Sequence, residues 1–164
     1  MKWNIKSILK EVLIVGVMVF VLSNIISYVR RPALNTDQLP QIKATLISGN
    51  QYIQKNNKPL VLHFWATWCP TCKLEAPNLE TVSKNYEVLT IAVQSGSDDK
   101  IKAYMKENHL NFQVINDANA KWAKQFNIEA YPTTFIYNAK GKLQFSEVGY
   151  TSTAGLLARV KMAK

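Results

Sequence analysis

The strongest constraint on the fold of this 164-residue chain is the segment Trp68-Cys-Pro-Thr-Cys72, which holds both of its cysteines. With no third thiol, Cys69 and Cys72 can only pair with each other, bind something or exchange with another molecule. An uninterrupted apolar run at 59–65 precedes them and is typical of a buried strand, and residues 73–86 follow with helical periodicity. In the order strand, C-x-x-C, helix, this weak motif indicates thiol redox chemistry.

The N-terminal part is dominated by an apolar segment. Residues 12–29 contain no charged side chain in 18 positions, and roughly 20 apolar residues are needed to cross a bilayer. We therefore predict an uncleaved membrane anchor over 1–31, with its transmembrane helix at about 12–29. A cleaved secretion signal is the first alternative, although the apolar run is long and lacks a small-x-small cleavage site. A buried core helix is the second, although the run shows no amphipathic pattern.

The charges beside this segment predict its orientation. Three lysines and the terminal amine precede it, and two arginines follow it. The positive-inside rule then leaves the N-terminus in the cytoplasm. A domain carrying C-x-x-C finds disulfides to act on outside the membrane. We expect a single-pass protein of the bacterial cytoplasmic (inner) membrane whose C-terminal domain faces the periplasm or extracytoplasmic side.

The formal charge of +9 does not predict nucleic-acid binding. Five of the 20 basic residues flank the apolar segment, and from residue 32 onward 15 basic side chains face 10 acidic ones. The remaining lysines are scattered singly and are not grouped with stacking aromatic residues. An ordinary solvated surface accounts for them.

The rest of the chain predicts one α/β domain at 41–164 after a polar linker at 32–40. Strands and helices alternate, and the turn at 138–141 predicts a hairpin near the end, so a central mixed sheet flanked by helices is expected. The expected elements are an edge strand at 42–47, one or two helical turns at 51–57, strands at 59–65, 88–93, 112–115, 133–137 and 143–148, and helices at about 70–86, after 95–99, at 118–126 and from 152 onward.

Four features carry a family resemblance over residues 40–164. They are the run Phe64–Cys72, Pro77 five residues after the second cysteine, Tyr131-Pro132-Thr133, and the strand–helix insert at about 95–126. With these four features together, the chain resembles the thioredoxin superfamily. Within that superfamily it resembles the membrane-anchored TlpA/ResA-like thiol:disulfide oxidoreductases. The resemblance implies a thioredoxin-like sandwich.

Two further segments, Gln94–Asp99 and Gly149–Gly155, resemble the suppressor-of-copper-sensitivity D (ScsD) branch of this superfamily. The family resemblance implies exchange of a disulfide with protein dithiol or disulfide substrates and no bound cofactor beyond the cysteine pair. It also implies a membrane electron-transfer partner that resets the pair. The reductant direction is preferred on this resemblance, and the oxidant direction stays open.

The two cysteines have different expected roles. At a helix start, Cys69 would face unpaired N–H groups and the positive end of the helix dipole, which favour the thiolate. Cys69 is therefore the predicted nucleophile, and Cys72, further inward, resolves the mixed disulfide. Pro70 is tolerated at the first helical position. A purely structural disulfide is the alternative, but a loop this short constrains the unfolded chain little.

The resemblance implies a substrate-binding surface made of Trp68, Pro70, Tyr131 and Pro132. In the resembled family, the proline corresponding to Pro132 is cis and lies against the C-x-x-C. The backbone of the residue before it, here Tyr131, pairs with an extended substrate. Pro77 is expected to bend its helix.

Two titratable residues are candidates for proton transfer. Glu75 falls on the helix side of Cys72, where burial would raise its pKa and allow it to exchange a proton with that thiol. ResA-like proteins carry a glutamate at this spacing, and a surface acid is the alternative. His63 stands where thioredoxin has a buried aspartate. It is either a proton acceptor or a buried histidine bonded to a backbone carbonyl.

Two rival functions use the same residues differently. Two thiolates and a histidine suit copper(I), so a copper-binding thioredoxin-like protein or metallochaperone using Cys69 and Cys72 is the main alternative. A structural zinc site would need four ligands, and we expect no metal there. An inactive docking module would give no reason for both cysteines to stand together with Pro132.

Overall fold

A computed structural model describes residues 5–29, 32, 36–54 and 57–163, with parts of the first helix (5–7, 23–24 and 26–29) described by their backbone only. The chain divides into two compact units, Met1–Arg31 and Pro32–Lys164. The flanking residues Lys2, Arg30 and Arg31 and the linker positions 33–35 lie outside the described residues.

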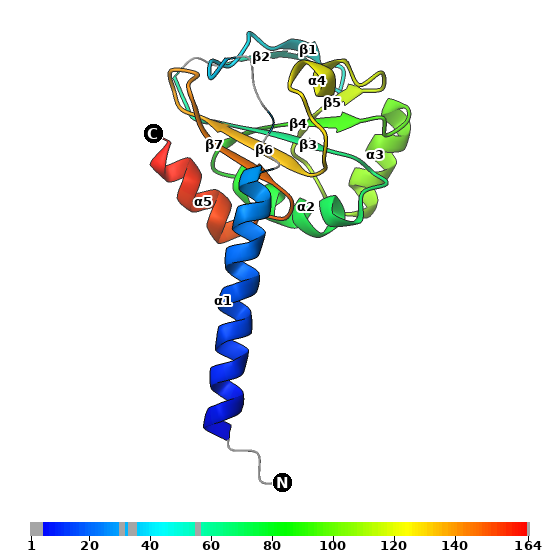
Figure 1. The fold of residues 1–164 in the computed structure, drawn as a ribbon. Coiled ribbons are helices and arrows are strands. Elements are labelled where there is room, and N and C mark those ends of the chain that lie inside the picture. Colours follow the sequence, from blue (N-terminus) through cyan, green and yellow to red (C-terminus); the bar gives the residue numbers. More distant parts are fainter. Residues whose placement is uncertain (1–4, 30–31, 33–35, 55–56, 164) are drawn as a thin grey trace. The chain divides into compact units, whose positions relative to one another are not determined.

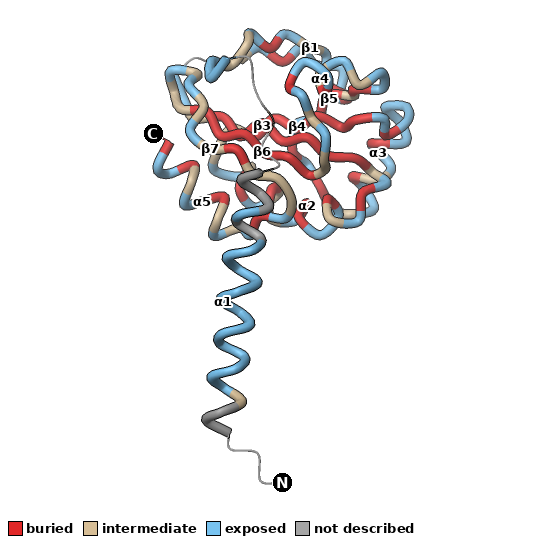
Figure 2. The backbone as a smooth tube through the Cα atoms, in the orientation of Figure 1, coloured by how far each residue is buried: buried red, intermediate tan, exposed pale blue. Residues whose placement is uncertain are grey.

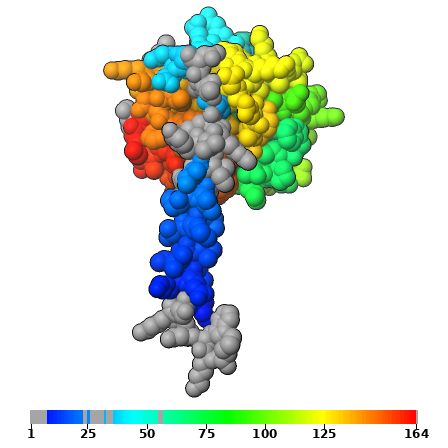
Figure 3. Space-filling view, viewed as in Figure 1, coloured from blue at the N-terminus to red at the C-terminus, as the bar shows by residue number. Residues whose placement is uncertain are grey.

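The first unit is the helix α1 (Ile5–Val29), drawn in blue in Figure 1. From Leu9 to Ile25, the large apolar side chains that the structure describes are exposed, with 47–69% of their surface accessible. Figure 3 shows this helix in blue. Over the described residues, no helix is both long and apolar enough to cross a membrane. The transmembrane span predicted at about 12–29 is therefore not confirmed.

The second unit is built on a five-stranded mixed sheet with the order β5-β4-β3-β6-β7 (Figure 1). The central strand β3 runs parallel to β4 and antiparallel to β6. All of β3 is buried, as expected for an apolar run covered on both faces. The strands are β3 Leu60–Trp65, β4 Glu87–Val93, β5 Gln113–Asp117, β6 Thr133–Tyr137 and β7 Leu143–Val148. The α/β class and these strands are confirmed, with small shifts at their ends.

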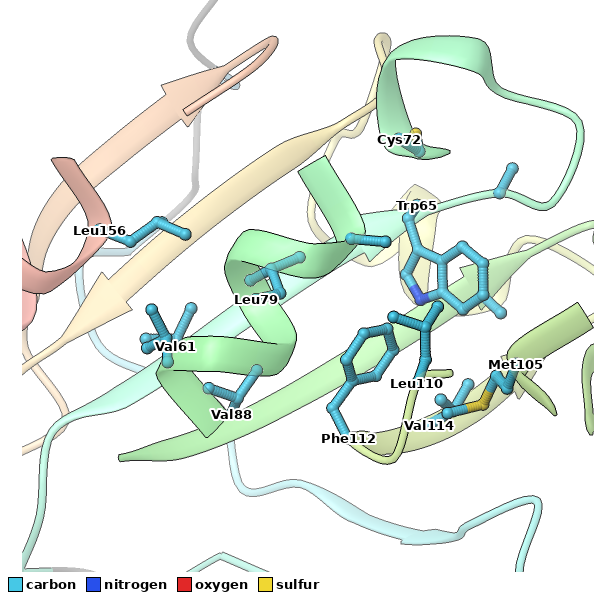
Figure 4. Close-up of a cluster of buried hydrophobic side chains, with 14 of the residues drawn as sticks. Val61, Trp65, Cys72, Leu79, Val88, Met105, Leu110, Phe112, Val114 and Leu156 are labelled. Atoms are coloured by element: carbon cyan, nitrogen blue, oxygen red, sulfur yellow. The ribbon is translucent and has the colours of Figure 1, made fainter. Parts of the chain in front are cut away.

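Side chains alternate along the strands, so the sheet has two separate apolar faces. In Figure 2 the strands β3, β4 and β6 are almost entirely buried. One face packs against three helices, α2 (Pro70–Ser83), α3 (Asp98–Glu107) and α5 (Thr153–Met162). The opposite face packs against α4 (Lys121–Gln125) and against the hairpin formed by β1 (Lys43–Thr45) and β2 (Gln51–Ile53). Figure 4 shows the residues packed on the first face, among them Trp65 of β3 and Cys72 and Leu79 of α2.

The predicted helical turns at 51–57 are wrong over 51–53. These residues form β2 (Gln51–Ile53), which pairs antiparallel with β1 (Lys43–Thr45) in a separate two-stranded sheet. The hairpin closes through Leu46 N–H donating to the carbonyl of Asn50, with Gly49 at a φ of 89° that favours glycine. β1 therefore is not an edge of the central sheet. Residues 55–56 lie outside the described part of the chain.

Candidate active site

The two cysteines stand where β3 passes into α2. β3 ends at Trp65, and a turn over Ala66–Cys69 is closed by Cys69 N–H donating to the carbonyl of Ala66 at 3.2 Å. Cys69 then caps α2 in an extended conformation, and Pro70 occupies the first helical position. A proline is suited to this position because its missing N–H would have no helical acceptor.

Cys69 and Cys72 are joined by a disulfide, with their Cα atoms 5.3 Å apart. The backbone N–H of Cys72 donates to Sγ of Cys69 at 3.2 Å. That sulfur therefore receives one of the N–H groups left unpaired at a helix start, and it lies at the positive end of the helix dipole. Cys69 is 5% exposed and Cys72 is 2% exposed. Cys72 is therefore the more buried of the two, as expected, but only by a small margin.

Two aromatic residues, Trp68 and Tyr131, stand in contact next to the turn that carries the cysteines. Trp68 is 58% exposed, and its ring meets Tyr131 edge-on with centroids 5.6 Å apart. Tyr131 packs against the apolar cluster that contains both cysteines. The Tyr131–Pro132 bond is cis, as the resemblance implied, and Pro132 is buried. Burial, and secondarily the negative charge of Asp117, raises the pKa of Tyr131.

Glu75 is fully buried on the face of α2 that also buries Cys72 and Leu79. The surface-acid alternative is therefore wrong. Burial raises the pKa of Glu75 to about 8, against a smaller lowering by the N–H of Thr151, which donates to Oε1 at 3.2 Å. Its Oε2 atom has no hydrogen-bond partner among the described residues. Glu75 is thus an uncharged acid at neutral pH that ionises near the pH range of thiols.

His63 is also buried, at 1% exposure, on β3. Its Nδ1 lies 2.9 Å from the hydroxyl of Thr134, its antiparallel neighbour, so this nitrogen has a side-chain partner and not the backbone carbonyl of the second alternative. Burial lowers the pKa of His63 to about 3. A base this weak holds a proton poorly at neutral pH, so the opposite pKa shifts that burial gives the two residues favour Glu75 over His63 for proton exchange.

One residue of this arrangement was not predicted from the sequence. Thr151, on the loop between β7 and α5, binds Glu75 through its N–H and accepts from Nδ2 of Asn78 at 3.0 Å through its carbonyl. Its backbone makes these bonds, 76 residues away from Glu75. No local pattern marks such a contact.

The described residues give no support to copper binding. They contain no group of three or more His, Cys, Asp or Glu side chains that could hold a metal ion. The two sulfurs are bonded to each other, and the ring of His63 is already paired with Thr134.

Comparison with known proteins identifies the family. Residues 32–146 match the AhpC/TSA family. The chain belongs to this family. A thioredoxin-like protein of Haemophilus influenzae is 30% identical over 165 residues, which cover 98% of each chain. The thiol-disulfide oxidoreductase ResA of Bacillus subtilis is 33% identical over 90 residues, or 52% of this chain and 50% of ResA.

A solved structure agrees with this assignment. A secreted Mycobacterium tuberculosis disulfide oxidoreductase homologous to Escherichia coli DsbE superposes with a TM-score of 0.66 at 29% identity, covering 74% of this chain and 96% of the other. This AhpC/TSA-family chain is accordingly a thiol-disulfide oxidoreductase of the thioredoxin-like type, with a confirmed thioredoxin-like fold. Membership in the ScsD branch stays a prediction.

Proposed function

We propose that the chain exchanges the Cys69–Cys72 disulfide with protein substrates outside the cytoplasmic membrane, working as a reductant. The observation that carries this proposal is the position of Cys69 Sγ at the start of α2, where it accepts the N–H of Cys72 directly after the exposed residue Trp68. Such a position stabilises a thiolate, and the thiolate is the form that attacks disulfides.

The proposed reaction has two steps. The Cys69 thiolate attacks one substrate sulfur, a mixed disulfide forms, and the other substrate sulfur leaves as a thiolate. The Cys72 thiolate then attacks Cys69 Sγ, which closes the internal disulfide and releases the second substrate sulfur. The substrate gains two electrons and the enzyme loses two.

Glu75 has a proposed role in the second step. Cys72 must lose its proton before it attacks, and Glu75 lies one helical turn away on the same buried face. With a pKa of about 8, the ionised form of Glu75 is the minor one at neutral pH; that form can take up the proton of Cys72, and its share increases as the pH rises toward 8. His63 is proposed to stay neutral and to have a packing role within the buried strand β3. Trp68, Pro70, Tyr131 and Pro132 are proposed to contact the substrate.

The reductant direction is tested by the midpoint potential of the full chain, titrated in detergent with glutathione buffers. We expect a two-electron midpoint at about −250 mV or lower, as for reductants, rather than about −120 mV, as for strong oxidants. A Cys72→Ser variant serves as the control, because it cannot close the internal disulfide. A midpoint near the oxidant value would contradict the direction. Absence of a reversible couple, together with copper(I) binding, would favour the copper alternative.

We further propose that α1 attaches the protein to a membrane, which would allow a membrane electron-transfer protein to reset the cysteine pair. Large apolar side chains along α1 are exposed, among them Leu13 and Phe20 at 69% each. Exposed apolar surface on this scale is expected to be covered by another apolar phase.

The attachment is tested by co-sedimentation with phospholipid vesicles. The wild-type chain is expected to stay bound at high salt, and Leu13→Lys with Phe20→Lys to be released, since a lysine within the bilayer costs about 3 kcal/mol. Met162→Lys on α5, at a position 71% exposed, is the matched control and should stay bound. Release of the wild-type chain by salt alone would argue against apolar attachment.

A further inference from the structure

The loop between β4 and α3 contacts the turn that precedes the cysteines. Ser95, on this loop, is 6% exposed. Its hydroxyl accepts the backbone N–H of Thr67 at 3.0 Å and donates to the carbonyl of Val93 at 3.1 Å. The hydroxyl therefore bridges the end of β4 and the turn Ala66–Cys69; its bond to Val93 is buried, and its bond to Thr67 is partly buried.

The residue before Ser95 makes a second contact to the same turn. The carbonyl of Gln94 accepts the indole N–H of Trp68 at 3.2 Å. Gln94 has a φ of 46°, in the left-handed region that residues other than glycine seldom occupy. Its own N–H is held by the carbonyl of Asp117 at 3.1 Å. An uncommon backbone conformation thus aims the carbonyl of Gln94 at Trp68.

These contacts converge on the two central residues of one turn. Thr67 is held by the side chain of Ser95, Trp68 is held by the backbone of Gln94, and Cys69 follows directly as the cap of α2. We propose that Ser95 is a positioning residue for disulfide exchange, which sets the placement of Trp68 and of the Cys69 sulfur. This inference rests on the roles proposed above for Trp68 and Cys69.

Ser95 acts through the turn and has no described bond to either sulfur. If its hydroxyl is removed, the N–H of Thr67 is left without its partner, and the turn must shift to reach water or another acceptor. A small shift matters for two reasons. It moves Cys69 Sγ away from the N–H of Cys72, and it displaces the surface that meets the substrate. Reaction rates fall steeply when reacting atoms are misplaced by as little as 1 Å.

The test compares two serine-to-alanine variants in the full chain. Ser95→Ala removes the bridging hydroxyl. Ser146→Ala on β7 removes a hydroxyl that is 7% exposed and has no hydrogen-bond partner among the described residues, so it is the matched control. With insulin as the disulfide probe, we expect kcat/KM to fall about tenfold in Ser95→Ala, and to stay near wild type in Ser146→Ala.

A second measurement separates positioning from general stability. Alkylation of reduced Cys69 by iodoacetamide, followed by mass spectrometry against pH, reports its thiolate fraction. We expect the rate at pH 6 to fall several-fold in Ser95→Ala, because the sulfur loses stabilisation at the helix start. Ser146→Ala should leave this rate unchanged, and Ser95→Thr, which keeps the hydroxyl, should restore it.

The inference is overturned if Ser95→Ala retains wild-type kcat/KM and an unchanged alkylation profile. If Ser95→Ala does not fold, amide exchange of the wild-type chain decides instead, since a bonded Thr67 N–H should be strongly protected and an unbonded one should not. A failure of the proposed function is recognised by a different variant. An active Cys69→Ser variant would contradict the proposed function, whatever the result for Ser95→Ala.

Discussion

Replacing Cys69 by serine is expected to lower the rate of insulin reduction by about a thousandfold or more. A serine hydroxyl is un-ionised at neutral pH and cannot form a disulfide with the substrate. The fold should survive, because the side chain is of similar size and serine is a favourable helix cap. The rate of insulin precipitation in excess dithiothreitol measures the loss, and far-ultraviolet circular dichroism confirms the fold.

The other cysteine provides the informative comparison. Cys72→Ser keeps the attacking thiolate but cannot release the mixed disulfide, so a covalent complex with insulin should accumulate and dissolve on reduction. If Cys69→Ser traps substrate and Cys72→Ser does not, the two assigned roles are reversed. If neither variant loses activity, the exchange mechanism is contradicted.

The second large expected effect concerns the free energy of unfolding, which should be level over a range of pH and fall on either side of it. Two buried groups, Glu75 and His63, set the two limits because their pKa values shift in opposite directions. Glu75 has a pKa raised from 4.5 to about 8, so the folded chain holds its proton more tightly than the unfolded chain. Its stabilising contribution is complete below pH 4.5 and is lost as the pH rises to about 8. His63 has a pKa lowered from 6.5 to about 3. Its contribution is complete above pH 6.5 and is lost as the pH falls to about 3.

These two dependences overlap between pH 4.5 and 6.5, where their slopes have opposite signs and cancel. From pH 6.5 to 8 only Glu75 continues to change, and the free energy of unfolding is expected to fall by about 2 kcal/mol. From pH 4.5 to 3 only His63 changes, and a similar fall is expected in the acid direction. Urea denaturation at half-unit steps of pH measures both limits of the plateau.

One substitution isolates the alkaline limit. Glu75→Gln keeps an oxygen that can accept the N–H of Thr151 but has no proton to lose. The free energy of unfolding of this variant should be level from pH 6.5 to 8. Below pH 6.5 it should fall with acidity, because the contribution of His63 is no longer cancelled. If the alkaline fall persists in Glu75→Gln, another group causes it.

From residue 59 onward, the sequence alone determined the order of strands and helices and the place of the reactive cysteines. The apolar run at 59–65 predicted the buried strand β3, the periodicity after Cys72 predicted α2, and the C-x-x-C between them predicted the chemistry. The helical spacing placed Glu75 on the side of Cys72, and the structure then decided for burial against the surface-acid alternative. These features are local, because hydrophobic periodicity and helix capping are set by residues a few positions apart.

Tertiary structure alone decided which distant groups meet at the site. His63 bonds to Thr134 across two strands, Glu75 receives the N–H of a loop 76 residues away, and Ser95 holds the turn before Cys69. The short strand β2 likewise forms because β1 pairs with it. Such contacts depend on how the sheet orders its strands and how the loops pack against α2. No short stretch of sequence encodes them, because the partners become neighbours only when the whole domain closes its core.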